Sequence, residues 1–140
     1  MAIMALDVGS KRIGVAVADP SCSFAMPAAT VERTNLNADL ARLRALFDDY
    51  AVDELVIGDP ISLSGERGIA AQKMDEFVER LRAVYAGALH RVDERMTTAA
   101  ATKTLIAADV SRAKRKRAVD AMAAALILET YLARRRRETP

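Results

Sequence analysis

The chain has 140 residues, 51% of them apolar and 29% charged, so it can bury one ordinary core and is not generally disordered. Its 21 Lys and Arg residues against 19 Asp and Glu residues leave a net charge of only +2. No apolar run reaches the roughly 20 residues of a membrane span and no signal peptide is recognisable, so we expect a cytoplasmic protein with no membrane partner. The single cysteine, Cys22, excludes an internal disulfide framework.

The small net charge conceals a basic C-terminal segment. From Arg112 to Arg137, nine basic residues stand against two acids, Asp120 and Glu129. A cationic end on a nearly neutral protein indicates either contact with a polyanion or a solvated surface with a frayed tail. Charge alone does not choose between these two interpretations.

Apolar periodicity and turn residues predict the elements in chain order. The apolar run 3–6 leads into a tight turn at Asp7, and Ile13, Val15 and Val17 then alternate along a second strand, so the two strands form a hairpin. Next we expect a weak edge strand over 24–32, a helix capped by Asn37 and a strand over 54–58. A loop over 59–68 then leads to a helix over 70–81 and a strand over 89–92. The chain should end with a helix from Thr97 or Thr98 to about 108, a loop of Ser111 and basic residues, and a last helix with an apolar face from Val119 to Tyr131.

This order predicts an α/β fold. The first three strands are joined by short turns and must be antiparallel, whereas the later strands are joined by helices and should be parallel. The result is a mixed five-stranded sheet with helices on both faces. We expect one domain over residues 1–140, with a basic tail from about residue 133.

Acidic residues lie where the predicted elements end or begin. Asp7 follows the first strand, Asp93 and Glu94 follow the fifth, and Asp120 lies in the last helix. Clustered carboxylates raise one another's pKa unless a cation joins them, and hard Mg²⁺ or Mn²⁺ suits oxygen ligands. Taken singly, each acid also fits a simpler role. Asp7 could cap the turn, and Asp93 or Glu94 could form a surface ion pair with a neighbouring arginine. Asp120 could interact favourably with the helix dipole as an acid in the first turn.

Four sequence blocks resemble the YqgF/RuvX family, whose members are described as pre-16S ribosomal RNA nucleases and as Holliday-junction-resolvase-like. The first is DVGSKRIGVAVADP, over residues 7–20. The others are the 58–73 segment with its Gly-Asp-Pro start, DERMTT over 93–98, and the segment 116–132 that begins KRAVDAMAA. Any one block would be weak evidence, but together they span nearly the whole chain in the right order.

The resemblance implies a ribonuclease H-like fold and metal-dependent hydrolysis of phosphodiester bonds, with Mg²⁺ or Mn²⁺ as cofactor. Carried over by motif, the family's catalytic and metal-ligating acids fall on Asp7, Glu94 and Asp120. The implied task is processing of the 5′ end of pre-16S rRNA in ribosome biogenesis. Asp59 stands where the family usually has an apolar residue, so it is either an extra ligand or a plain loop acid. Asp93 is a further candidate ligand.

Basic residues near these acids are candidates for binding substrate phosphates, which would position a nucleic acid without reading its sequence. With aromatic residues at only 4%, recognition should depend on backbone and shape rather than on base stacking. The candidates are Lys11, Arg12, Arg95, Lys114, Arg115, Lys116 and Arg117.

Three other functions remain open at this stage. Resolution of branched DNA at Holliday junctions would use the same residues and would favour a dimer, whereas the nuclease itself is expected to be a monomer or a weak homodimer. A catalytically silent RNA-binding factor in ribosome maturation or transcription would bind RNA in a salt-dependent way. An ATP-handling protein would need a second lobe that 140 residues cannot supply.

Overall fold

The computed structural model describes residues 2–19, 21, 24–59, 68–93 and 112–138, and of residues 70, 112–119, 137 and 138 it describes the backbone alone. Strands and helices follow one another largely as the apolar patterns predict. They are β1 (Ala2–Val8), β2 (Arg12–Ala18), β3 (Ala25–Glu32), α1 (Leu36–Asp49), β4 (Val52–Asp59), α2 (Ile69–Leu81), β5 (Ala88–Asp93) and α4 (Arg112–Glu138).

The strands form a five-stranded sheet in the order β3-β2-β1-β4-β5. β1 pairs with β2 and β2 with β3 in antiparallel register, while β4 pairs with both β1 and β5 in parallel register. This confirms the predicted mixed sheet. β1 is the central strand, so the residues that follow it lie at the middle of the end of the sheet where β1 finishes.

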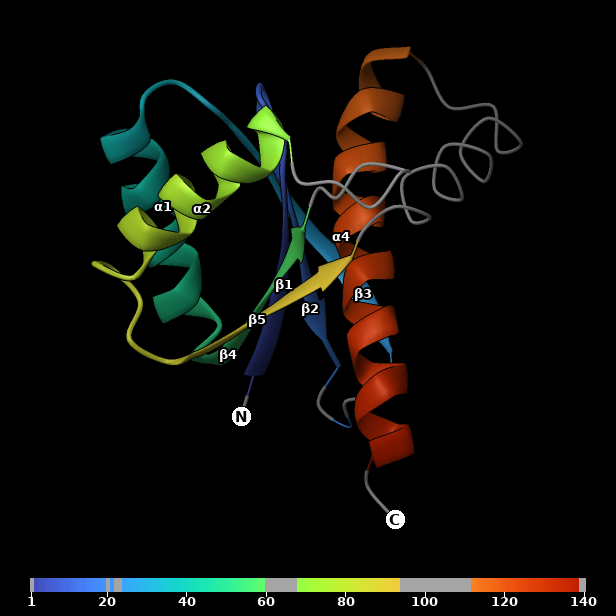
Figure 1. Cartoon of the computed structure of the whole chain (residues 1–140). Helices are drawn as coiled ribbons and strands as arrows, with labels where there is room; N and C mark the ends of the chain where they lie inside the picture. Colours follow the sequence, from blue (N-terminus) through green and yellow to red (C-terminus); the bar gives the residue numbers. More distant parts are fainter. Residues whose placement is uncertain (1, 20, 22–23, 60–67, 94–111, 139–140) are drawn as a thin grey trace.

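Helices cover both faces of the sheet, with α1 and α2 on one side and α4 on the other (Figure 1). Strand alternation creates the two apolar layers, because successive side chains point to opposite faces. Met4, Leu6, Leu55 and Ile57 pack toward α1 and α2. The layer under α4 is rich in small residues: Ile3, Ala5, Ala16, Val56 and Val92 from the sheet meet Ala124, Ala125, Ile127, Leu128 and Leu132 from the helix.

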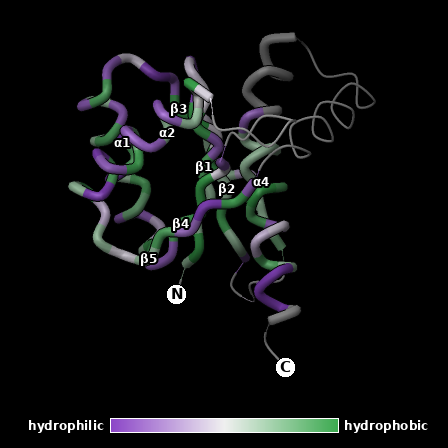
Figure 2. Tube along the Cα trace, viewed as in Figure 1, coloured by the Kyte–Doolittle hydropathy of each residue, from purple (hydrophilic) through white to green (hydrophobic). Residues whose placement is uncertain are grey.

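The hydropathy pattern follows these layers: β1, β2 and β4 are mostly hydrophobic, β5 contains several hydrophilic residues, and α1 and α2 carry hydrophobic and hydrophilic residues in alternation (Figure 2). Helix α4 combines an apolar face with many charged residues. Within the part of the chain that the structure describes, no helix is both long and apolar enough to span a membrane.

Helix α1 begins earlier than its expected cap at Asn37. The cap is Asn35, whose extended backbone lets its side chain accept a hydrogen bond from the Ala38 N–H. Asn37 lies inside the first turn of the helix.

Helix α4 also corrects two expectations about the basic C-terminal segment. Residues 112–117, expected in a loop, already belong to the helix, which continues through Glu138. The segment from residue 133 is therefore helical through Glu138 rather than a frayed tail, and the Arg135 guanidinium lies 3.2 Å from Glu54 of β4. The expected helix from Thr97 or Thr98 and the loop residue Ser111 lie outside the described residues.

Candidate functional site

Gly14 brings strand β2 into direct contact with helix α4. A Cβ atom placed on Gly14 would lie 1.8 Å from the backbone oxygen of Asp120 and 2.9 Å from the nitrogen of Ala121. Only a hydrogen atom fits in this space, so the α4 backbone rests on the β2 backbone at this point. The contact fixes where Asp120 stands over the sheet.

Asp7 lies on the same face of the sheet, beside this contact. It pairs with Gly14 in the antiparallel register of β1 and β2. Ile3 and Ala5, at alternate positions earlier in β1, both belong to the apolar layer under α4. Because alternate residues of a strand share a face, the half-buried Asp7 also faces α4. The fold therefore brings Asp7 and Asp120, which are far apart in the sequence, to one place.

Arg12 forms an ion pair with Asp120 across the same contact. Its Nε donates a hydrogen bond of 2.7 Å to Asp120 Oδ2, and the two side chains are 24% and 22% exposed. The sequence suggested Arg12 only as a phosphate-binding residue, and the ion pair was missed because the partners are 108 residues apart. Strand alternation was the available signal, since Arg12 and Gly14 must share a face.

Asp59 lies on the opposite face of the sheet from Asp120. It ends β4 after Leu55 and Ile57, which pack toward α1 and α2, and it is 8% exposed. Its carboxylate accepts a hydrogen bond of 2.9 Å from Arg91 NH2, and Arg91 NH1 also donates to Asp75 of α2 at 2.6 Å. The burial of Asp59 is thus compensated by an arginine on the α2 side.

Asp93 shares that α2 face. It pairs with Asp59 in the parallel register of β4 and β5, and registered neighbours point to the same side. Val92, one residue earlier, packs under α4. Neither Asp59 nor Asp93 is therefore brought together with Asp7 and Asp120.

Lys11 is exposed in the turn between β1 and β2, and the structure does not describe the side chains of the remaining candidates. Glu94 and Arg95 lie outside the described residues. Lys114, Arg115, Lys116 and Arg117 belong to α4, where only their backbone is described, and the last two precede Asp120 by about one helical turn. Among the described residues, no group of three or more His, Cys, Asp or Glu side chains could hold a metal ion.

Asp7 and Asp120 fit a hard divalent cation by their chemistry. Both offer carboxylate oxygens, which Mg²⁺ and Mn²⁺ prefer, and the rigid contact at Gly14 holds their backbones in place. The Arg12 guanidinium shows that the Asp120 carboxylate already attracts a cation.

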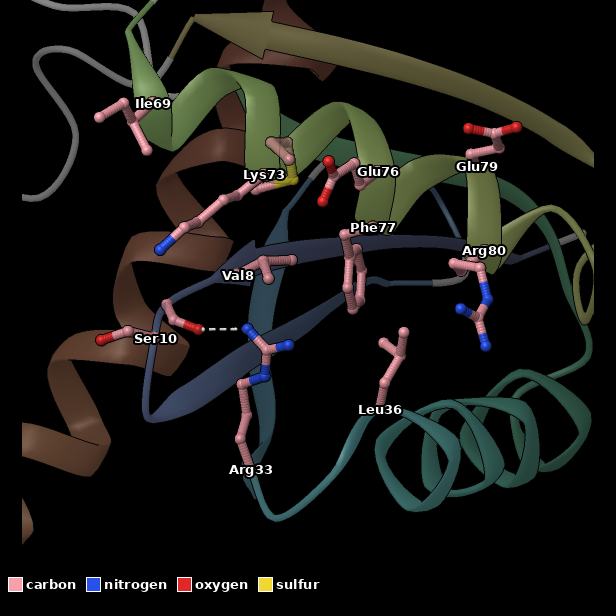
Figure 3. A pocket seen from close by; sticks show the side chains of 12 residues that line it. Val8, Ser10, Arg33, Leu36, Ile69, Lys73, Glu76, Phe77, Glu79 and Arg80 are labelled. Atoms are coloured by element: carbon pink, nitrogen blue, oxygen red, sulfur yellow. Dashed lines mark hydrogen bonds between the residues drawn. The ribbon is translucent and has the colours of Figure 1, made fainter.

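A groove of about 860 Å³ lies between the turn that joins β1 to β2 and helix α2, on the face of the sheet opposite to α4. Val8, Leu36 and Phe77 form its apolar floor, and Lys73 points into it from α2 (Figure 3). Arg33 closes one side, where its NH1 donates a hydrogen bond of 2.9 Å to the Gly9 carbonyl oxygen. This bond and the one from the Gly9 N–H to the Arg12 carbonyl oxygen, 2.9 Å, hold the turn that follows Asp7.

Comparison with known proteins identifies relatives over nearly the whole chain. Relatives named "Putative pre-16S rRNA nuclease" include one from Moorella thermoacetica, 45% identical over 134 residues that cover 96% of each chain. Another, from Heliobacterium modesticaldum, is 46% identical over 132 residues, which cover 94% of this chain and 89% of the relative.

Solved structures share the fold at low sequence identity. Thermus thermophilus RuvC in complex with a Holliday junction superposes with a TM-score of 0.57 at 13% identity, covering 96% of each chain. The fowlpox virus Holliday junction resolvase superposes with a TM-score of 0.56 at 17% identity, covering 96% of this chain and 99% of the resolvase. The ribonuclease H-like fold is therefore confirmed.

The sequence model of the RuvX family, described as a Holliday junction resolvase, matches residues 1–134. Together with the full-length relatives, this match confirms the resemblance seen in the four sequence blocks. The chain belongs to the RuvX family.

Proposed function

We propose that this protein is a metal-dependent nuclease that hydrolyses phosphodiester bonds during processing of the 5′ end of pre-16S rRNA in ribosome biogenesis, in the cytoplasm. The names of its relatives support this substrate. The observation that supports the proposal is that Asp7 and the Asp120 backbone both lie beside Gly14 on one face of the sheet, where their carboxylates would supply the first ligands of a metal site.

Asp7, Glu94 and Asp120 are the proposed ligands of Mg²⁺ or Mn²⁺ and the catalytic acids. Asp93 is left out of the set, since it shares the face of Arg91 and Asp59, and Glu94 is taken from the family motif alone. A bound divalent cation supplies activation of the attacking water and stabilisation of the leaving oxygen. Asp59 is not included in the proposed set, because its carboxylate pairs with Arg91 on the opposite face.

Basic residues on two sides of the acids would bind the substrate backbone. Lys11 is exposed in the turn beside Arg12, and the Lys114–Arg117 run precedes Asp120 along α4. Arg95 is proposed as a further phosphate contact from the sequence alone. These charges would orient the RNA by its phosphates and make binding depend on salt.

Replacing Asp7 tests the proposal. We expect the wild type to cleave a 5′-extended 16S rRNA fragment with Mg²⁺ or Mn²⁺, and Asp7→Asn to lose at least about 100-fold in rate, since a metal ligand becomes a neutral amide. Asp49→Asn, an exposed acid at the end of α1, serves as the matched control and should cleave like the wild type. Equal rates for Asp7→Asn and the wild type would rule out Asp7, and RNA binding without any cleavage would favour the silent binding factor.

Resolution of branched DNA is the second candidate, favoured by the resolvase description of the family and by the fold shared with resolvases. The same acids would serve both reactions, so competition between the rRNA fragment and a four-way DNA junction separates them. Preferential, paired cleavage of the junction by a dimer would replace rRNA processing as the proposed function.

A further inference from the structure

The ion pair between Arg12 and Asp120 occupies one of the proposed metal ligands. The Arg12 Nε lies 2.7 Å from Asp120 Oδ2, and both side chains are mostly buried. The contact at Gly14, two residues along β2, fixes the α4 backbone at Asp120, so the helix cannot slide to separate the two groups. The pair is therefore held in place by the fold rather than formed by chance at a mobile surface.

A divalent cation and the guanidinium would compete for this carboxylate. A metal ion held by Asp120 would share this carboxylate with the Arg12 guanidinium, whose Nε lies 2.7 Å from Oδ2. Like charges at this separation repel strongly where water is partly excluded. Arg12 already holds Oδ2, so a metal ion that takes both oxygens of Asp120 must displace it, and one that takes Oδ1 alone binds against the repulsion of the guanidinium.

We propose that Arg12 is a positioning residue that neutralises Asp120 in the metal-free protein and is displaced when the divalent cation binds both oxygens of this carboxylate. This inference rests on the proposed function, since it concerns the same carboxylates. The displaced guanidinium is left beside the metal site, and its planar set of donors matches the oxygens of a phosphate. Metal binding would thereby release a phosphate-binding group next to the place where the scissile phosphate must lie.

Titration with Mn²⁺, followed by the EPR signal of the free ion, tests the competition on the protein alone. We expect Arg12→Gln to bind Mn²⁺ about three- to tenfold more tightly than the wild type, as expected for removal of a partly exposed competing ion pair. Lys11→Gln removes one positive charge from the neighbouring residue in the turn and so controls for the loss of a nearby charge. The affinity of this variant for Mn²⁺ should change less than about twofold. Arg12→Lys, which keeps the charge without the guanidinium, should fall between the wild type and Arg12→Gln.

Thermal unfolding separates this role from a purely structural one. Without metal, Arg12→Gln should melt below the wild type because Asp120 loses its partner. At saturating Mn²⁺ this difference should shrink or reverse, since the metal takes over the carboxylate in both proteins. A structural ion pair would keep the same difference in Tm with and without Mn²⁺.

The outcomes distinguish this inference from the proposed function. If the wild type binds Mn²⁺ and Arg12→Gln binds it equally or more weakly, the competition is wrong and the nuclease proposal stands. If Asp120→Asn binds Mn²⁺ as tightly as the wild type, or if no protein binds it, the metal site is wrong and the inference fails with it.

Discussion

Gly14 is the residue on which the candidate site depends most directly. Its missing side chain allows α4 to lie against β2, and this contact places Asp120 next to the register partner of Gly14, Asp7. The sequence offered Gly14 only as a small residue in an alternating strand. Its role could not be predicted, because the atom that it must accommodate comes from a helix more than a hundred residues away.

Replacing Gly14 with alanine should damage both stability and activity. The added methyl group would overlap the Asp120 carbonyl oxygen and force α4 away from the sheet, at a cost of at least about 2 kcal/mol in the free energy of unfolding. Urea denaturation measures this cost. Gly68→Ala is the control, because nothing lies within 4 Å of its added Cβ, and it should lose at most about 1 kcal/mol as a weaker helix cap. Equal losses in the two variants would contradict the close contact.

Asp59 illustrates how far sequence patterns reach at the residue scale. Counting alternate positions from Leu55 and Ile57 would have placed it on the α1 and α2 face, away from Asp120. Its partner Arg91 was beyond prediction, since the two residues meet only because β4 and β5 are neighbours in the sheet.

At the scale of elements, the end of α4 is fastened to the sheet by a polar cluster around Glu54. The Tyr131 hydroxyl and Arg135 NH1 both donate to the Glu54 carboxylate, and His90 Nε2 lies 3.3 Å from it. The His90 and Tyr131 rings stack with centroids 5.0 Å apart. These contacts explain why the basic segment continues as a helix, since its residues have partners on β4 and β5.

Tyr131→Phe should therefore loosen the end of α4. The change removes one hydrogen bond to a mostly buried carboxylate while keeping the ring stack, and should cost about 1 to 2 kcal/mol. Urea denaturation of the variant measures this loss. Tyr50→Phe, at a 41% exposed tyrosine, should change stability by less than about 0.5 kcal/mol. If both variants match the wild type, the cluster does not hold the helix.

At the scale of the whole molecule, an apolar layer covers each face of the sheet, and neither layer includes a residue of the candidate metal site. The carboxylate of Asp120 already has a counter-ion in Arg12. The fold should therefore not depend on the metal, unlike small domains whose folding is driven by metal binding.

Chelation of divalent cations should abolish cleavage and leave the protein folded. In EDTA we expect an unchanged far-UV circular dichroism spectrum and a single cooperative thermal transition, at a lower Tm than with Mn²⁺. Addition of excess Mg²⁺ or Mn²⁺ should restore cleavage. Loss of helical signal in EDTA would show that the metal is part of the fold.

The sequence by itself determined the fold class and the family. Local periodicity reports which residues of a strand share a face, and the family's motifs survive as contiguous blocks, so both can be read from one chain. The mixed sheet, the family and most of the elements were predicted in this way and are confirmed.

Only the tertiary structure decided how these residues meet. It brought Asp7 and Asp120 together over Gly14, paired Arg12 with Asp120, turned Asp59 toward Arg91, and fastened the C-terminal basic segment to Glu54. Each of these contacts joins elements that are distant in the sequence. Which residues meet depends on where α4 crosses the sheet and on the order of the strands, and local sequence patterns encode neither.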